Sequence, residues 1–200
     1  MPSRFKGRGI SAAVLLIALT VAAPFPMQAA GASTASVSSI RIQNFGQVSP
    51  TYFRGAQPQG SDYADLAALG VKTVIDLTDG DGQATEKASV ERAGMTYVRI
   101  PMSTHESVSN AKIAEFLALV DNAANQPVYV HCVGGRHRTG VMTAIYRMTN
   151  NGWTADKAFA EMKQYKFGAD FLHPEFKQAV YSYKPEVNRA AAMTATKVGS

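Results

Sequence analysis

Apolar residues recur along the chain in two periods that alternate. The helical period is clearest at Ile113, Phe116, Leu117, Val120 and Ala124. Short runs rich in β-branched residues occupy 71–77, 96–100 and 127–131 and predict strands. Because strands and helices alternate, we expect an α/β fold with a central, mostly parallel sheet flanked by helices.

Capping and turn residues delimit the other elements. Ser61 can cap a helix over 61–69, and Pro101 ends the strand over 96–100. Further helices are predicted at 86–93, after Gly140, after Thr154 and within 171–183.

The first 32 residues have the organisation of a secretory signal peptide. Arg4, Lys6 and Arg8 precede an apolar run over 10–23, and Ala30-Gly31-Ala32 has the form of a signal-peptidase site. An uncleaved membrane anchor is the alternative, but the run is shorter than the ~20 residues that a spanning helix needs. We expect cleavage after residue 32, which leaves 168 of the 200 residues in the periplasm or outside the cell, without stable membrane association.

Segments without an apolar period flank the predicted domain. Residues 33–39 are rich in serine and predict a flexible leader, and 185–200, rich in alanine and threonine, predict a flexible tail. The folded domain is expected over 40–184. A content of 46% hydrophobic and 18% charged residues suffices for one core and excludes a disordered chain.

Charge and cysteine content narrow the function further. The net charge of +5 falls to +2 beyond residue 32, where 17 basic residues face 15 acidic ones, and this is too little to indicate nucleic-acid binding. Cys132 is the single cysteine, which excludes an intrachain disulfide and a multi-cysteine metal site. An unpaired thiol in an exported protein is exposed to oxidation, so its presence calls for a chemical explanation.

The stretch from His131 to Gly140 lies where a predicted strand leads into a helix, and α/β sheets place ligand sites at such edges. Gly134 and Gly135 permit a tight turn whose backbone N–H groups can bind a tetrahedral oxyanion together with the helix dipole. Arg138, at the helix entrance, can hold two phosphate oxygens with its planar guanidinium.

The same surroundings favour a thiolate at Cys132. A cysteine at a helix N-terminus beside an arginine can have its pKa lowered from ~8.5 into the range ~3.5 to 7.5. A thiolate beneath a bound phosphate suits in-line attack on phosphorus, which gives a phosphocysteine that water then hydrolyses. The hydroxyl of Thr139 can donate to the departing sulfur. The loop lacks the Lys-Ser/Thr pair of the ATP-binding P-loop.

These residues resemble the His-Cys-x5-Arg-Thr-Gly signature of the cysteine-dependent protein tyrosine and dual-specificity phosphatases. The run Gly135-Arg136-His137-Arg138-Thr139-Gly140 is similar to the Gly-Lys-His-Arg-Thr-Gly form of the atypical, plant-and-fungal-like branch, some of whose members act on inositol phosphates. The opening segment of small phosphatases of this type resembles Tyr52-Phe53-Arg54-Gly55-Ala56-Gln57-Pro58. The resemblance covers about residues 40–180 and implies a dual-specificity-phosphatase-like fold.

The resemblance also implies a role for each residue of the loop. It makes Cys132 the nucleophile, Arg138 the phosphate clamp and Thr139 the partner of the leaving thiolate, and it has His131 orient the loop from below. The residues that it assigns to phosphate binding are Val133, Gly134, Gly135, Arg136, His137 and Arg138. A hydrogen-bonded scaffold residue or a solvated cation is the alternative role for the two histidines.

A general acid is the part of the family pattern that this chain lacks, because the acid is usually an Asp on the loop before the Cys strand. That loop reads Met102-Ser103-Thr104-His105-Glu106-Ser107. We expect Glu106, or else His105, to act as the acid. A solvated loop without an acid role is the alternative. Asp79 and Asp81 lie in a glycine-rich turn that can rim the pocket, but they have no third ligand at a spacing suited to a metal.

The sequence thus predicts an exported phosphomonoesterase that hydrolyses phosphotyrosine or a related ester through phosphocysteine, without a metal or other cofactor. An inositol phosphate is an alternative substrate, because Arg136 and His137 add positive charge beside Arg138. A weak phosphate-binding module is a second class of function, and a redox sensor or sulfur-transfer protein is a third, since an accessible thiol of low pKa is open to oxidation. We expect a monomer whose partner is a phosphorylated protein or an inositol phosphate.

Overall fold

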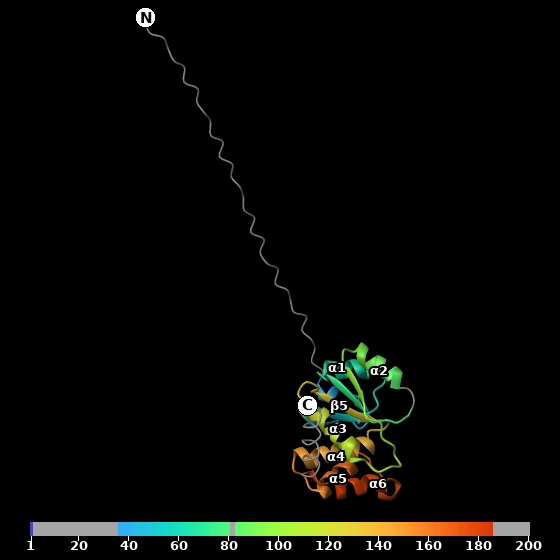
Figure 1. Cartoon of the computed structure of the whole chain (residues 1–200). Helices are drawn as coiled ribbons and strands as arrows, with labels where there is room; N and C mark the ends of the chain where they lie inside the picture. Colours follow the sequence, from blue (N-terminus) through green and yellow to red (C-terminus); the bar gives the residue numbers. More distant parts are fainter. Residues whose placement is uncertain (2–35, 81–82, 186–200) are drawn as a thin grey trace. The chain divides into compact units, whose positions relative to one another are not determined.

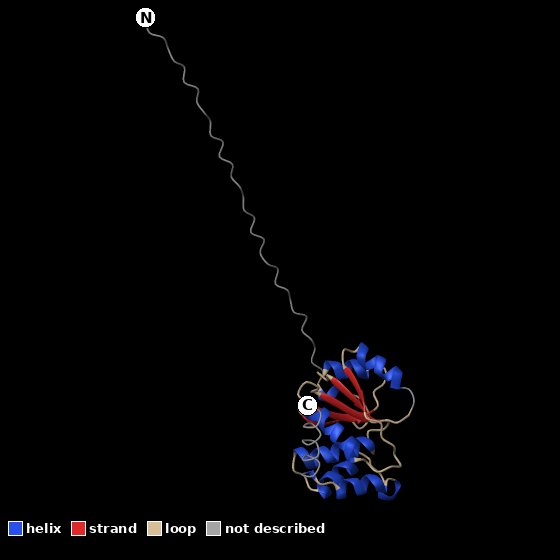
Figure 2. Ribbon diagram, viewed as in Figure 1, coloured by secondary structure: helices blue, strands red, loops and turns tan. Residues whose placement is uncertain are grey.

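Five strands form one sheet in the order β1-β2-β5-β3-β4, with helices on both faces (Figures 1 and 2). The computed structural model describes residue 1 and residues 36–80 and 83–185. The strands are β1 (Gly46–Ser49), β2 (Tyr52–Ala56), β3 (Thr73–Asp76), β4 (Thr96–Arg99) and β5 (Val128–Cys132). β1 runs antiparallel to β2, whereas β2, β5, β3 and β4 are parallel neighbours. The predicted α/β class with a mostly parallel sheet is confirmed.

The helices form two layers. One layer holds α1 (Asp62–Ala68) and α2 (Gln83–Arg92), and the other holds α3 (Asn110–Asp121), α4 (Arg138–Asn150), α5 (Ala155–Gln164) and α6 (Pro174–Ser182) (Figure 1). Two short 3-10 helices complete the described chain, η1 (Val37–Ser39) and η2 (Asp170–Leu172). Among the residues that the structure describes, no helix is both long and apolar enough to cross a membrane.

Alternate residues of the inner strands belong to two separate cores. Val74 and Tyr129 pack in the core with α1 and α2, whereas Ile75 and Val130 pack in the core with α3 to α6. Every residue of β5 is buried, because helices cover both faces of this central strand. A continuous apolar run at 128–130 is therefore what the packing requires.

Three details of the predicted elements are wrong or incomplete. Ser61 lies at the N-cap of α1 but makes no capping hydrogen bond with its side chain. The helix predicted within 171–183 is divided into η2 and α6, because Pro174 disfavours a helical conformation at His173. The strands β1 and β2 were not predicted, since β1 is short, polar and irregular in register at 47–49.

The predicted signal peptide and tail fall almost wholly outside the described residues. Of the predicted leader, residues 36–39 are described, and they include the exposed helix η1. The first buried apolar residues are Ile40 and Ile42, which join the core with α1 and α2.

Candidate active site

Cys132 is the last residue of the central strand β5, and its thiol lines a pocket at the carboxyl edge of the parallel strands. Residues 133–137 connect β5 to α4, which begins at Arg138. The pocket has a volume of about 390 Å³ and is lined by Gln43, Thr104, Cys132, Val133, Gly134, Arg136, His137 and Arg138. The structure thus brings the predicted nucleophile and most of the predicted phosphate-binding residues together.

The path of the loop requires glycine at position 135. Gly135 has φ +63°, and a Cβ placed there would lie 2.4 Å from the carbonyl carbon of Gly55 in β2. A side chain at 135 would therefore collide with the neighbouring strand. Gly134 is under no such constraint, because a Cβ there would meet only the flexible side chain of Arg136 at 3.5 Å.

The thiol of Cys132 lies in surroundings that favour the thiolate. Cys132 is only 3% exposed, and this burial raises the pKa of its thiol. The side chain and amide of Thr139, the charge of Arg138 and the amide of Arg136 outweigh burial and bring the pKa below the ordinary value of a thiol. The hydroxyl of Thr139 is buried and makes no regular hydrogen bond among the described residues, so it is free to turn toward the sulfur, whose pKa it lowers.

Arg138 is buried at the pocket wall and already engaged by an anion. Its Nη1 donates to Oδ1 of Asp79 at 2.5 Å and to the carbonyl of Met102 at 3.1 Å. Asp79 follows β3, and its side chain is 48% exposed. A carboxylate that this chain supplies therefore contacts the guanidinium that the sequence assigns to substrate phosphate.

His131 lies on the opposite face of β5 from Cys132, between two buried carboxylates. Its Nε2 is 3.0 Å from Oε1 of Glu86, and its Nδ1 is 3.9 Å from Oδ1 of Asp76. Burial lowers the pKa of His131, but the close approach and charge of Glu86, together with Asp76 and Cys132, outweigh it and raise the pKa above the ordinary value. The two carboxylates thus favour the protonated form of the histidine beneath the loop.

Asp76, Glu86 and His131 offer three atoms close enough together to be considered as metal ligands. The arrangement suits a proton better, because the two carboxylates face opposite nitrogens of the imidazole ring. Asp76 also accepts hydrogen bonds from the amide and hydroxyl of Thr78 and from the hydroxyl of Tyr97, at 2.7 to 2.9 Å. Its lone pairs are accordingly directed to protein donors.

His137 lines the pocket, and His173 packs against it from behind. The rings of His137 and His173 lie 3.9 Å apart between centroids, and Nε2 of His137 is 2.9 Å from the carbonyl of Phe167. Burial lowers the pKa of His137, as do the neighbouring His173, Arg136 and Arg138. The ring of His173 also approaches the carbonyl of Thr104 at 3.2 Å.

The loop expected to supply the acid reaches the pocket through Thr104. His105 and Glu106 are both exposed and do not line the pocket of Cys132. Glu106 instead borders a small hollow with Met102, Ser103, Ser107, Val108 and Lys112. The acid role of either residue stays a prediction.

Sequence reasoning assigned no role to several residues of the site. Gln43, Thr104 and His173 carry no motif that a single sequence can display, since they come from three loops that only the fold brings together. Glu86 was assigned only to a helix.

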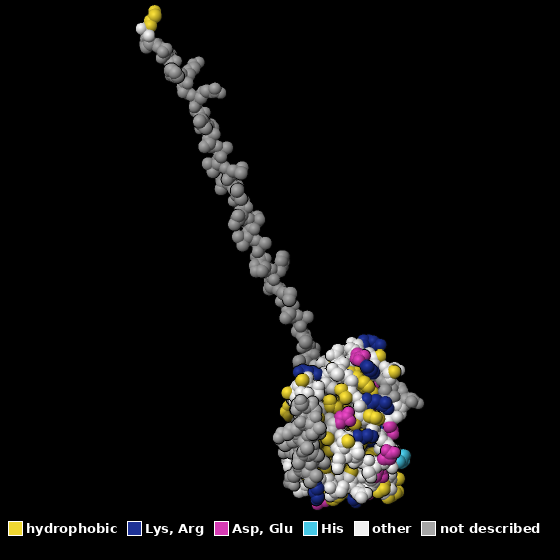
Figure 3. Space-filling view, viewed as in Figure 1, with side chains coloured by type: hydrophobic (Ala, Val, Ile, Leu, Met, Phe, Trp, Pro, Cys, Tyr) yellow, Lys and Arg dark blue, Asp and Glu magenta, His cyan; other side chains and the backbone are white. Residues whose placement is uncertain are grey.

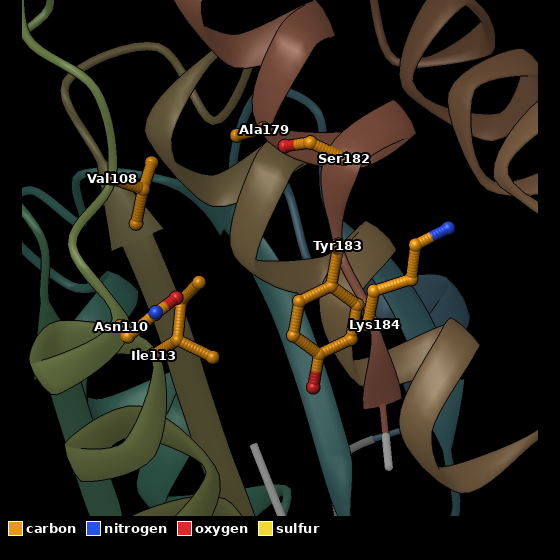
Figure 4. Close-up of a pocket in the computed structure, with 7 residues that line it drawn as sticks. All are labelled: Val108, Asn110, Ile113, Ala179, Ser182, Tyr183 and Lys184. Carbon is orange, nitrogen blue, oxygen red and sulfur yellow. The ribbon is translucent and has the colours of Figure 1, made fainter. Parts of the chain in front are cut away.

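Other surfaces of the described part offer less chemistry. In the view of Figure 3, basic and acidic side chains are interspersed and neither sign gathers into a patch. A second cavity, of about 180 Å³, lies where the start of α3 meets the end of α6, with Ile113 on one side and Tyr183 on the other (Figure 4). Its lining contains one charged residue, Lys184.

Comparisons with known proteins agree with this geometry. "Dual specificity protein phosphatase TpbA" of Pseudomonas aeruginosa is 34% identical over 127 residues, which are 62% of this chain and 56% of TpbA. "Inositol diphosphatase SIW14" of Saccharomyces cerevisiae is 25% identical over 130 residues, 62% of this chain and 46% of SIW14. The chain thus spans about half the length of these curated relatives.

Solved structures match over a larger share. A crystal structure of a P. aeruginosa TpbA variant in complex with pTyr superposes with a TM-score of 0.65 at 28% identity, over 75% of this chain and 90% of that one. The model of a phosphatase family matches residues 34–179, a range that contains the whole sheet and the loop after Cys132. The chain therefore belongs to the family described as DSP-PTPase phosphatase fused to NAD+ kinase.

Proposed function

We propose that the protein is a cysteine-dependent phosphomonoesterase that acts on phosphotyrosine or a related phosphate ester. The observation that carries the proposal is the position of Cys132, buried in the lining of a pocket where Thr139, Arg138 and the amide of Arg136 lower the pKa of its thiol against the effect of burial. Backbone N–H groups at the start of α4 and the guanidinium of Arg138 supply the positive field that a phosphate dianion needs.

The reaction has two displacements at phosphorus. The thiolate of Cys132 attacks phosphorus, an S–P bond forms, and the P–O bond to the leaving group breaks while that oxygen takes up a proton. Water then attacks the phosphocysteine, the S–P bond breaks, and inorganic phosphate leaves. The hydroxyl of Thr139 donates to the sulfur in both steps, so the thiolate is a good leaving group in the second.

The direct test is phosphate release from an aryl phosphate by the purified protein under reducing conditions, beside Cys132→Ser. We expect turnover in the natural protein and none in the variant, which keeps the loop and loses the nucleophile. Turnover that survives in Cys132→Ser would refute cysteine catalysis.

Two substrate classes are suggested by the relatives of this chain. TpbA is described as a dual-specificity protein phosphatase and SIW14 as an inositol diphosphatase, and both resemble this chain. We favour a phosphorylated protein, because identity to TpbA is higher and a TpbA variant has been solved with pTyr. A comparison of kcat/KM for a phosphotyrosyl peptide and for an inositol phosphate separates the two, and a preference for the inositol phosphate would reverse the assignment.

We also propose that Glu106 or His105 protonates the leaving oxygen once substrate is bound. A positioned acid contributes roughly 10² to 10⁴ in rate, and aryl esters with good leaving groups need it least. Glu106→Gln and His105→Asn should therefore reduce alkyl phosphate hydrolysis more than aryl phosphate hydrolysis. Unchanged rates in both variants across leaving groups would remove the proposal.

A phosphate-binding module is the second candidate, and a specific contact favours it. The carboxylate of Asp79 lies on Arg138, and neither candidate acid lines the pocket. A protein that binds tungstate at Cys132 but releases no phosphate from any ester would support this function over hydrolysis.

We propose that the protein is exported, on the strength of the cations, apolar run and Ala30-Gly31-Ala32 motif within the first 32 residues. Mass analysis of the protein isolated from its host is expected to show a chain that begins at residue 33. A chain that retains residues 1–32 in the cytoplasm would contradict export.

A further inference from the structure

Three successive carbonyls of the loop after Cys132 accept hydrogen bonds from groups outside the loop. The amide of Gln57 donates to the carbonyl of Val133 at 3.2 Å. The side chain of Asn44 donates from Nδ2 to the carbonyl of Gly134 at 2.7 Å, and that of Arg54 from Nη2 to the carbonyl of Gly135 at 2.7 Å. All three donors come from β2 or the segments beside it.

These hydrogen bonds fix the direction of the loop amides. In a planar trans peptide the C=O of one residue and the N–H of the next point to opposite sides. Carbonyls of residues 133–135 that face the outer donors therefore turn the amides of 134–136 away from those donors. The side to which they turn is that of the pocket, which Cys132, Val133, Gly134 and Arg136 all line, and the amide of Arg136 is among the groups that lower the pKa of the thiol.

Arg54 also places a buried positive charge beneath the loop. It is fully buried in β2, and its Nε and Nη1 have no hydrogen-bond partner among the described residues. Its guanidinium lies over the ring of Tyr165, 3.9 Å from the centroid, and no carboxylate of the described chain is within ion-pair distance. A buried cation without an ion-pair partner is costly: Glu161 and Cys132 act on Arg54 only from beyond ion-pair distance, and an anion held by the adjacent loop would offset the remaining cost.

Asn44 is held in an unusual backbone conformation. Its φ is +54°, in the left-handed region that few residues other than glycine adopt. In this conformation its side chain hydrogen-bonds Gly134, which lies 90 residues further along the chain. The turn before β1 is thus shaped so that it supports the loop.

We propose that Arg54 and Asn44 are positioning residues of the anion site: they hold the loop carbonyls outward so that the amides face the anion, and Arg54 adds a buried positive charge beneath it. The proposal rests on the proposed function, in that the anion is the substrate phosphate above the Cys132 thiolate. Neither side chain lines the pocket, so both act through the loop.

Arg147 provides a matched structural control for Arg54. It donates from Nη1 to the carbonyl of Val48 at 2.8 Å and lies over the ring of Trp153 at 4.4 Å, which are the same kinds of contact. Its charge, however, is neutralised by Glu161 at 2.7 Å. Lys166 is the control for Asn44, since it has φ +63° but, unlike Asn44, no hydrogen bond in the described part of the chain from its side chain to the loop after Cys132.

The test follows the alkylation of Cys132 by iodoacetamide in the full chain, as a function of pH and of tungstate concentration. Because Cys132 is the single cysteine, the modified site is unambiguous. The pH profile reports the thiolate pKa, and protection by tungstate reports the affinity for an oxyanion. Neither readout requires turnover.

We expect Arg54→Met to raise the thiolate pKa and to weaken tungstate protection about tenfold, whereas Arg147→Met lowers the melting temperature and changes neither readout. Arg54→Lys, which keeps the charge, should restore the pKa more fully than the affinity. Asn44→Gly, which suits the backbone conformation, should weaken protection about threefold, and Lys166→Gly should not.

Unchanged profiles in folded Arg54→Met and Asn44→Gly would overturn the proposal. If Arg54→Met does not fold, Asn44→Gly against Lys166→Gly decides. If the natural protein releases no phosphate from an aryl phosphate, but Arg54→Met and Asn44→Gly still weaken its protection by tungstate, the positioning roles hold and the hydrolase function fails. A natural protein without tungstate protection would overturn both.

Discussion

His131 and Cys132 are neighbours in sequence, yet their surroundings on the two faces of the sheet shift their pKa values in opposite directions. His131 faces α2 and lies between the carboxylates of Glu86 and Asp76, which raise its pKa. Cys132 faces α4 and meets Thr139, Arg138 and loop amides, which lower its pKa. Burial opposes the charged form of both residues, and on each face the local partners outweigh it.

The comparison shows that the pKa values of adjacent residues in one strand can shift in opposite directions when each face of the sheet supplies its own partners. The side chains of adjacent strand residues point to opposite faces, so the carboxylates beside His131 stay on the side away from the Cys132 sulfur. Variants on one face should therefore affect that face first, and three substitutions test this separation.

Arg138→Lys should have the largest effect. Lysine keeps the charge but loses the planar fork that binds two phosphate oxygens, and loss of such a donor costs on the order of 10² to 10³ in rate. We expect kcat/KM for an aryl phosphate to fall by this factor, while Arg147→Lys leaves kcat/KM within a small factor of that of the natural protein. Equal losses in the two variants would mean that the effect is on folding.

Glu86→Gln should lower stability on the histidine face. Removal of one partner from a buried ion pair costs about 3 kcal/mol, and Glu91→Gln, at an exposed site of the same helix, should cost far less.

The loss in Glu86→Gln should also depend on pH. The pKa of His131 is raised on folding, so its stabilisation is fully present below the unfolded value of about 6.5 and is lost as pH rises through the folded value. Urea unfolding from pH 5 upward should show the difference between natural protein and variant shrinking with pH. A difference that is constant with pH would show that His131 is neutral.

Thr139→Val should have the smallest effect, on the thiolate alone. A hydrogen bond to a charged group contributes about 1.5 to 3 kcal/mol, which corresponds to a rise of about 1 to 2 units in the pKa of Cys132. Thr143→Val, one turn further along α4, removes a hydroxyl that pairs with Tyr52 and should leave the alkylation profile of Cys132 unchanged. A profile that moves equally in both variants would place the effect in the packing of α4.

The sequence predicted the strand-loop-helix unit around Cys132 well, because apolar period, glycines and cations are all local there. It could not show that Arg54 stands beneath the loop, since this depends on the pairing of β2 with β5 across some 75 residues of chain. Glu86 was likewise hidden, because a lone acid in a predicted helix is typical of a solvated face. The general acid could not be predicted, because the sequence offers two titratable residues on the loop, His105 and Glu106, and neither lines the pocket in the fold.

The contact between Asp79 and Arg138 makes phosphate binding an exchange of one anion for another. Arg138 is paired with Asp79, so the free energy of binding an anion at Arg138 is the difference between two ion pairs and not the formation of one. The half-exposed carboxylate regains water as it leaves, whereas the guanidinium remains buried throughout. We expect a ligand with one weak negative charge to gain little in such an exchange and a phosphate dianion to gain most, so that the Asp79 carboxylate selects against weakly charged ligands.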